Sequence, residues 1–203
     1  MVWILVLLPV AYLLGTFPSA QLVARAYGLD VTAAGSGNPG ASNVTRIAGW
    51  RAGAIVLVLD MAKGAIAAGV GYLVGGRPGA FALGAAAVLG HVLPLTRRFK
   101  GGKGVATAAG ALLVLYPEIW LILAVVWIVV ARVMKKSSVA SLVICVLFPI
   151  LAVVFGYATW EVVGLAVLAL LVIARHASNL RRLLRGEEHS LRGGTVPEPP
   201  TEE

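Results

Sequence analysis

Long apolar runs separated by short polar stretches make up most of this sequence. The runs cover approximately residues 2–24, 52–76, 79–96, 104–116, 117–134, 139–155 and 160–174. A helix needs about 20 apolar residues to cross the hydrocarbon core of a bilayer, so the pattern predicts seven transmembrane helices. The run at 104–116 would be roughly 20 Å long as a helix, so we expect it to cross only part of the core or to form a half-helix. Pro117 separates it from the next run, and treating 104–134 as one kinked helix would give six spans.

The composition places the chain in the membrane class. Hydrophobic residues make up 59% of the 203 residues, charged residues make up 13%, and the mean hydropathy is +0.90. Soluble domains carry about 25% charged residues, so we predict an all-α integral membrane protein. The length allows one helical membrane domain, residues 1–192, and no large soluble domain. Residues 193–203 are rich in proline and glutamate and are expected to form a disordered cytoplasmic tail.

Basic residues follow one side of the predicted bundle. With seven spans, the basic segments between the apolar runs all fall on one side of the membrane. They are the segments around Arg25, Arg46, Arg97 to Lys103 and Arg132 to Lys136, and the arginine-rich C-terminal stretch. The opposite side keeps only Arg77. Cytoplasmic loops carry an excess of Lys and Arg, so we predict an outside N-terminus and a cytoplasmic C-terminus. Orientation and contact with anionic lipids explain the net charge of +8, and we expect no nucleic acid partner. Six spans would break this alternation.

The first polar loop has the composition of an anion site. Glycines let consecutive backbone N–H groups converge on an anion, hydroxyls and amides add hydrogen bonds, and the nearby Arg46 can bind two oxygens at once. The residues concerned are Gly35, Ser36, Gly37, Asn38, Gly40, Ser42 and Asn43. An interfacial turn with snorkelling basic residues is an equally good interpretation of the composition alone.

A second basic glycine loop precedes the fourth apolar run. Gly101, Gly102 and Gly104 surround Lys103 at the start of that run, where free N–H groups and the helix dipole favour an anion. The spacing does not match the nucleotide-binding phosphate loop, so ATP binding by that mechanism is not expected. Anchoring of the loop at the cytoplasmic membrane surface is the alternative role for Lys103.

Two further polar groups lie near the ends of the apolar runs. If the last helix continues past residue 174, His176 and Asn179 share a face that points into the cytoplasmic opening. Asp60 and Lys63 lie one turn apart inside the second run, where a lone charge is costly, so we expect them to pair and support the structure. The histidines lack the spacing of metal ligands, and no serine-hydrolase elbow is present, so we predict no metal and no cofactor.

Three blocks resemble the bacterial acyl-phosphate:glycerol-3-phosphate acyltransferases of the PlsY type, and together they cover nearly the whole chain. They are Gly35-Ser36-Gly37-Asn38-Pro39-Gly40 with Asn43 and Arg46, Gly90-His91-x-x-Pro94 followed by Phe99-Lys100-Gly101-Gly102-Lys103-Gly104, and His176-x-x-Asn179-x-x-Arg182 leading to Gly186-x-Glu188. Lys136 to Ser141 also resembles the polar turn of that family. Ser42 stands where the family usually has threonine, which keeps the hydroxyl.

The resemblance implies acyl transfer from acyl phosphate to the primary hydroxyl of glycerol 3-phosphate, the first acylation of phospholipid synthesis, at the cytoplasmic face of a bacterial inner membrane. It implies catalytic roles for Ser36, Arg46, Lys103, His176 and Asn179. Arg46, Lys103, Ser138, His176 and Asn179 would bind glycerol 3-phosphate, and Ser36, Gly37, Asn38, Gly40, Ser42, Asn43, Gly101 and Gly102 would bind acyl phosphate. Glu188 would anchor the C-terminal segment.

The residues themselves show no strong general base. Acyl phosphate is an activated donor, so positioning and charge stabilisation can supply most of the rate, and we expect direct transfer without an acyl-enzyme. The proton would go to a substrate phosphate oxygen or to His176. A small anion transporter could use similar basic loops, but the chain shows no internal repeat, and a noncatalytic lipid-binding scaffold would not need three polar clusters. The sequence does not define the oligomeric state, and a monomer fits it.

Overall fold

A computed structural model describes residues 2–191 of the chain, and every regular element among these residues is helical. The elements are α1 Val2–Gly15, α2 Ser19–Ala26, α3 Ala41–Val92, the 3-10 turn η1 Leu95–Arg97, α4 Val105–Leu115, α5 Pro117–Met134, α6 Ser137–Val154, α7 Thr159–Arg175 and α8 Ala177–Leu184. The predicted all-α class is confirmed. The predicted disordered tail, 193–203, lies outside the described residues.

Helix α3 is not one straight helix, because its backbone leaves helical geometry at three glycines. Gly49 has φ 86° and Gly76 has φ 59°, and Gly75 beside it is also non-helical. Glycine adopts positive φ without the Cβ clash that other residues meet, so the chain can turn at these points. The breaks divide α3 into stretches 41–48, 50–74 and 77–92, and the last two correspond to two of the predicted spans.

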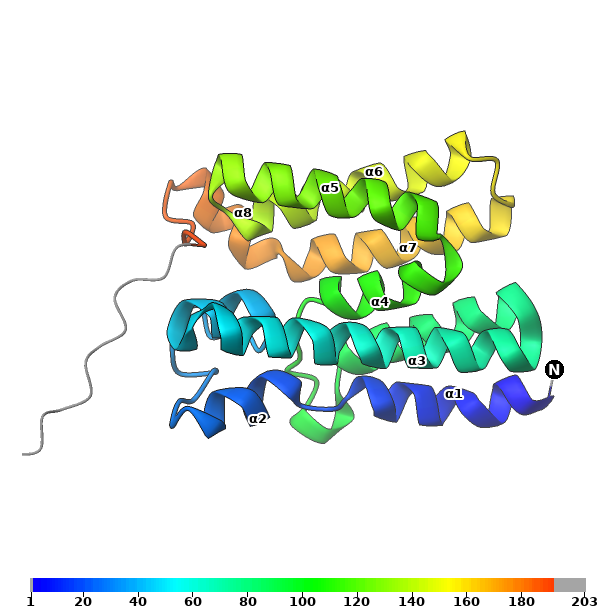
Figure 1. The fold of residues 1–203 in the computed structure, drawn as a ribbon, viewed down its shortest axis with the longest axis horizontal. Helices are drawn as coiled ribbons and strands as arrows, with labels where there is room; N and C mark the ends of the chain where they lie inside the picture. The colour runs from blue at the N-terminus through cyan, green and yellow to red at the C-terminus, as the bar shows by residue number, and fades with distance from the viewer. Residues whose placement is uncertain (1, 192–203) are drawn as a thin grey trace, which may run out of the picture.

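The helices run roughly along one axis. Most of their connections lie at two ends, and the segment between α3 and α4 lies partway along the bundle (Figure 1). One end, called the polar end here, contains residues 27–40, 135–136 and 176–191. The opposite end contains the N-terminus, the turn at 75–76 and the connections between α4 and α5 and between α6 and α7. Four helical segments are long and apolar enough to cross a membrane, or five if α7 and α8 count as one bent span. The count of seven spans stays a prediction.

Helix α4 is short and begins inside the bundle (Figure 1). Its 11 residues extend about 16 Å at 1.5 Å per residue, roughly half the hydrocarbon core of a bilayer. It packs backbone to backbone on α3, because a Cβ at Gly64 would lie 1.9 Å from the Thr107 carbonyl oxygen and one at Gly110 would lie 1.9 Å from that of Met61. Small residues allow such close approach in membrane proteins.

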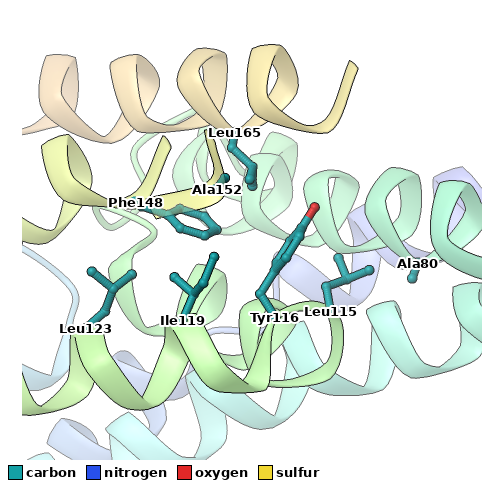
Figure 2. Packing of buried hydrophobic residues seen from close by; sticks show 8 residues of the cluster. All are labelled: Ala80, Leu115, Tyr116, Ile119, Leu123, Phe148, Ala152 and Leu165. Atoms are coloured by element: carbon teal, nitrogen blue, oxygen red, sulfur yellow. The ribbon is translucent and has the colours of Figure 1, made fainter. Parts of the chain in front are cut away.

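The largest apolar cluster joins α5, α6 and α7 to the end of α4. Figure 2 shows Tyr116 and Phe148 pointing into it between the helices, and their rings meet edge to face with centroids 5.7 Å apart. Beside this cluster Arg77 donates to Glu161 at 2.8 Å, and its guanidinium lies over the rings of Tyr116 and Tyr157, 5.1 and 5.0 Å from their centroids. These contacts fasten the helices together at the end away from the polar loops.

Candidate active site

A cavity of about 670 Å³ extends from the polar end into the bundle. Its polar wall contains Asn38, Gly40, Ser42, Lys103, Ser138 and His176, and its deeper wall is apolar and includes Phe81, Leu115, Trp120, Leu123, Phe148 and Leu165. Pockets that bind small molecules typically have a volume of this order, a mainly apolar wall and a few polar groups that converge on the ligand. The cavity therefore suits a ligand that is polar at one end and apolar at the other.

The first glycine loop is held in place by the buried amide of Asn43. Its Nδ2 donates to the carbonyl oxygens of Val31 and Ala34 at 3.1 and 3.0 Å, and its Oδ1 accepts from the Ser36 N–H at 2.8 Å and from Arg46 Nη1 at 3.2 Å. Both amide hydrogens and both oxygen lone pairs are thus occupied within the protein. The structure therefore gives the Asn43 side chain a positioning role: it fixes the loop and orients Arg46.

This arrangement directs the start of α3 towards the cavity. Gly40 caps the helix, its carbonyl accepts from the N–H groups of Asn43 and Val44, and Gly40, Ala41 and Ser42 line the cavity. The N–H groups of the first helical turn have no carbonyl partner within the helix and, with the helix dipole, favour an anion. The first turn of α4 lines the same cavity with Gly104, so two helix N-termini meet there.

The second glycine loop is packed against the end of α3. A Cβ at Gly101 would lie 2.1 Å from the His91 carbonyl oxygen, and one at Gly102 would lie 2.2 Å from His91 Nε2. The Gly102 N–H donates to the His91 carbonyl at 3.1 Å, and Arg175 Nη2 donates to the Gly101 carbonyl at 3.1 Å. Close packing thus requires glycine at 101 and 102, and it fixes the position of the adjacent Lys103.

His91 belongs to a buried polar cluster beneath this loop. Lys63 Nζ lies 2.8 Å from Asp60 Oδ1 and 2.8 Å from His91 Nδ1, and it also donates to the Phe17 carbonyl at 3.3 Å. The three ionisable residues are at most 6% exposed. The predicted ion pair between Asp60 and Lys63 is confirmed, and through His91 it supports the loop that carries Lys103.

Lys103 places a positive charge on the cavity wall. Among residues 2–191 no carboxylate lies within 4.0 Å of its ammonium group. Burial lowers the pKa of Lys103 to about 8; Glu188 opposes this shift, while Arg182, Arg46 and Arg175 add to it. A cation held partly away from water without a close counter-ion is favourably placed to bind an anionic ligand.

The corner between α7 and α8 supplies His176. The two helices are bent by 56° at this residue, so the last helix does not continue straight, which was the condition for His176 and Asn179 to share one helix face. His176 Nδ1 lies 2.7 Å from the Val172 carbonyl oxygen, which can only accept, so Nδ1 carries the proton and Nε2 has the free lone pair. The ring is 2% exposed and lines the cavity as a hydrogen-bond acceptor.

Glu188 ties the C-terminal segment to the site. Its Oε1 accepts from Ser138 Oγ at 2.9 Å and from Asn179 Nδ2 at 2.6 Å, and its Oε2 accepts from Arg182 Nε at 2.9 Å. Burial raises the pKa of the Glu188 carboxyl, but these hydrogen bonds outweigh it and hold the pKa below its usual value. Two more bonds fasten the segment: Arg46 Nε donates to the Ser190 carbonyl at 3.2 Å, and the Leu191 N–H donates to the Lys135 carbonyl at 2.8 Å.

The predicted site residues therefore fall into two groups. Those on the cavity wall are Asn38, Gly40, Ser42, Lys103, Ser138 and His176. Those behind the wall, which hold it in place, are Ser36, Gly37, Asn43, Arg46, Gly101, Gly102 and Asn179. The tryptophans of the wall, Trp50, Trp120 and Trp127, were not singled out from the sequence, because an aromatic residue in an apolar run carries no distinguishing signal.

Together the fold and the site define a helical integral membrane protein with a cationic recess that opens into an apolar cavity. Residues 5–186 match the family described as "Glycerol-3-phosphate acyltransferase". The glycerol-3-phosphate acyltransferases of Shewanella loihica and Shewanella sediminis are 46% and 44% identical to the chain, over 88% of the chain in both cases and over 88% and 89% of the relatives. The chain belongs to the glycerol-3-phosphate acyltransferase family.

The fold agrees with this assignment. The chain is similar to the crystal structure of PlsY, an integral membrane glycerol 3-phosphate acyltransferase, in its glycerol 3-phosphate form, with a TM-score of 0.88 and 37% identity. The match covers 92% of this chain and 94% of that one. The lysophosphatidic acid form of the same enzyme matches with a TM-score of 0.86.

Proposed function

We propose that this protein transfers a fatty acyl group from acyl phosphate to the 1-hydroxyl of glycerol 3-phosphate, giving 1-acyl-glycerol 3-phosphate and inorganic phosphate. This is the first acylation of phospholipid synthesis. The observation that carries the proposal is the single cavity that joins Lys103, Ser138 and His176 to a long apolar wall. Such a cavity accommodates an acyl chain and presents its activated end to a phosphate-bearing acceptor.

The two phosphates have separate sets of donors in this proposal. The acyl phosphate lies at the start of α3, with Asn38, Gly40 and Ser42 as contacts and with Ser36, Gly37, Asn43, Gly101 and Gly102 shaping the loops around it. Glycerol 3-phosphate lies nearer Lys103, Ser138 and His176, with Arg46 and Asn179 behind them. Glu188 already orders Ser138 and Asn179 and anchors the C-terminal segment.

The chemistry proceeds by direct transfer. The glycerol O1 attacks the acyl carbonyl carbon, the new C–O ester bond forms, the bond from that carbon to the phosphate oxygen breaks, and inorganic phosphate leaves. Lys103 and the two helix N-termini stabilise the negative charge that develops, which is electrostatic catalysis by groups already in place. Holding both substrates in one cavity adds the contribution of proximity.

The hydroxyl proton goes to an oxygen of a substrate phosphate. His176 Nε2 accepts a hydrogen bond from the hydroxyl and orients it, but Nδ1 donates to a backbone carbonyl, not to a carboxylate that would stabilise a charged ring. The variant His176→Gln should therefore retain substantial single-turnover transfer. Its complete loss would instead make His176 the base, and an acyl adduct trapped on Ser36 would refute direct transfer.

We also propose the topology predicted from charge: seven spans, an outside N-terminus and the polar end on the cytoplasmic face of a bacterial inner membrane. The polar end gathers the connections that follow α2, α5 and α7. Lys135 and Lys136 lie in the connection after α5, and Arg25 lies in the last turn of α2, whereas Arg77 follows the turn at the opposite end. Excess Lys and Arg marks the cytoplasmic side. Accessibility of single cysteines at 27 and at 158 to an impermeant thiol reagent in intact cells and in inverted vesicles tests this assignment.

A reconstituted assay tests the reaction itself. Purified protein with acyl phosphate and glycerol 3-phosphate should release inorganic phosphate and form lysophosphatidate in equal amounts, and both products should require both substrates. Arg46→Ala serves as the impaired control. Phosphate release no greater than that of Arg46→Ala, or release without lysophosphatidate, would contradict the proposal.

A further inference from the structure

A second cleft, of about 640 Å³, lies outside the candidate active site, between α2 with the loop that follows it and the segment after α3. Its wall includes three cations, Arg25, Arg97 and Lys100, against one carboxylate, Asp30. Within the described part of the chain, none of these cations has an ion-pair partner within 4.0 Å. Such an excess of unpaired positive charge in a cleft favours an anion.

Two of the side chains that line the cleft each have an atom that is buried without a hydrogen-bond partner among residues 2–191. These atoms are the donor Arg97 Nε and the acceptor Gln21 Oε1. Arg97 is already fixed, because its Nη2 donates to the Thr16 carbonyl at 3.2 Å. A buried polar atom without a partner costs free energy, so both atoms favour a ligand that accepts from an arginine and donates to an amide oxygen. A phosphate that carries a hydroxylated substituent does both.

Exposed apolar side chains lie close in sequence to the lining residues of both segments. Leu22 lies in α2 and Tyr27 is its C-cap, while Leu95 and Phe99 lie in the segment that follows α3. Each of these four residues is between 46% and 63% exposed. Large apolar groups beside a basic cleft match an amphiphile at a membrane surface, with its head group on the cations and its chains on the apolar residues. A soluble phosphate would gain nothing from them.

We propose that this cleft binds the head group of an anionic phospholipid, with the phosphate on Arg25, Arg97 and Lys100 and a head-group hydroxyl on Gln21. The ligand class is a phosphodiester with a hydroxylated head group, such as phosphatidylglycerol. The bound lipid would contact the segment that precedes each of the two glycine loops of the candidate active site, without entering that site. Asp30 and Thr32 precede the first loop, which Asn43 holds at Val31, while Lys100 directly precedes Gly101.

The occupied cleft therefore acts as a brace for both loops. Bound lipid connects the segment at 30–32 to the segment at 97–100, and the positions of Ser36 and Lys103 depend on these segments. The lipid that the protein's membrane provides would thus influence the geometry of the candidate active site without entering it.

Native mass spectrometry of the full chain in detergent tests binding, with phosphatidylglycerol as the probe. Arg25→Gln/Lys100→Gln removes two exposed cations of the cleft. It leaves Arg97 in place, because Arg97 also donates a hydrogen bond to the Thr16 carbonyl. Arg181→Gln/Arg185→Gln is the matched control, since it removes two exposed cations that do not line the cleft, one in the last turn of α8 and one at its C-cap. We expect the first variant to bind phosphatidylglycerol about tenfold more weakly and the control to differ from wild type by less than about twofold.

Equal affinity in wild type and the cleft variant, or equal loss in both variants, would overturn the proposal. Soluble glycerophosphoglycerol, the same head group without acyl chains, distinguishes the source: if it binds as tightly as the lipid, the membrane assignment is wrong. Binding is measured without acyl transfer, so this result and the test of the proposed reaction can fail independently. Activity in bilayers with and without phosphatidylglycerol then tests the brace, because the activating effect of the lipid should diminish in the cleft variant and persist in the control.

Discussion

Adding one methyl group at Gly101 should disable the enzyme without unfolding it. In the structure a Cβ at this position would lie 2.1 Å from the His91 carbonyl oxygen, whereas ordinary van der Waals contact begins at 3.4 Å. The difference is 1.3 Å, and both sides of the contact are backbone, so no side chain can rotate away. The loop must move by about that distance and carry Lys103 with it. Misplacement of a reacting group by about 1 Å costs about 100-fold in rate, or about 2.7 kcal/mol of transition-state stabilisation.

The assay compares Gly101→Ala with Gly69→Ala, measuring kcat/KM in the reconstituted reaction and thermal unfolding in detergent. Gly69 lies in the helical stretch 50–74, and a Cβ there meets nothing within 4 Å. That control should retain wild-type activity and gain up to about 1 kcal/mol of stability from helix propensity. If Gly101→Ala is folded and within about twofold of the control in kcat/KM, the packing argument for the second loop is wrong.

Three other predictions concern charges. Because the pKa of Lys103 is about 8, its positive charge is complete well below that pH and disappears above it, so KM for glycerol 3-phosphate should rise up to about tenfold per pH unit above 8, and Lys103→Arg should remove this dependence. Glu188 raises the pKa of Lys103, so Glu188→Gln should move the onset of the KM increase to lower pH; an unchanged profile would contradict that coupling. Lys63→Met leaves the carboxylate of Asp60 buried without its lysine partner, so the free energy of unfolding should fall by about 3–5 kcal/mol. A lower melting temperature in detergent would report this loss.

The elements that sequence reasoning located well are those fixed by local pattern. Apolar runs bounded by polar residues gave the main helices, and Pro117 marked the break between α4 and α5 because proline starts a helix more readily than it continues one. The spacing of Asp60 and Lys63 was sufficient to predict their ion pair, since one helical turn separates them.

The features that were missed depend on contacts between distant segments. No proline or glycine precedes His176 to indicate the bend, which is accompanied by the hydrogen bond to Val172 and by the anchoring of Asn179 through Glu188. A glycine that contacts an anion and one that packs against backbone look the same in a sequence, so Gly101 and Gly102 were assigned to ligand contact alone. The apolar cavity wall is likewise indistinguishable from any lipid-facing run.

The shortness of α4 has a consequence for how two immiscible reactants meet. Because that helix is only about half as long as a bilayer core is thick, its start, directly after Lys103, lies inside the bundle and short of the polar end (Figure 1). In the proposed reaction, the water-soluble reactant would enter the bundle to reach the acyl carbonyl, so the fatty chain would not have to be raised into water. Exposing four methylene groups would cost about 3 kcal/mol, at about 0.8 kcal/mol each, and a half-length helix avoids that penalty in every turnover.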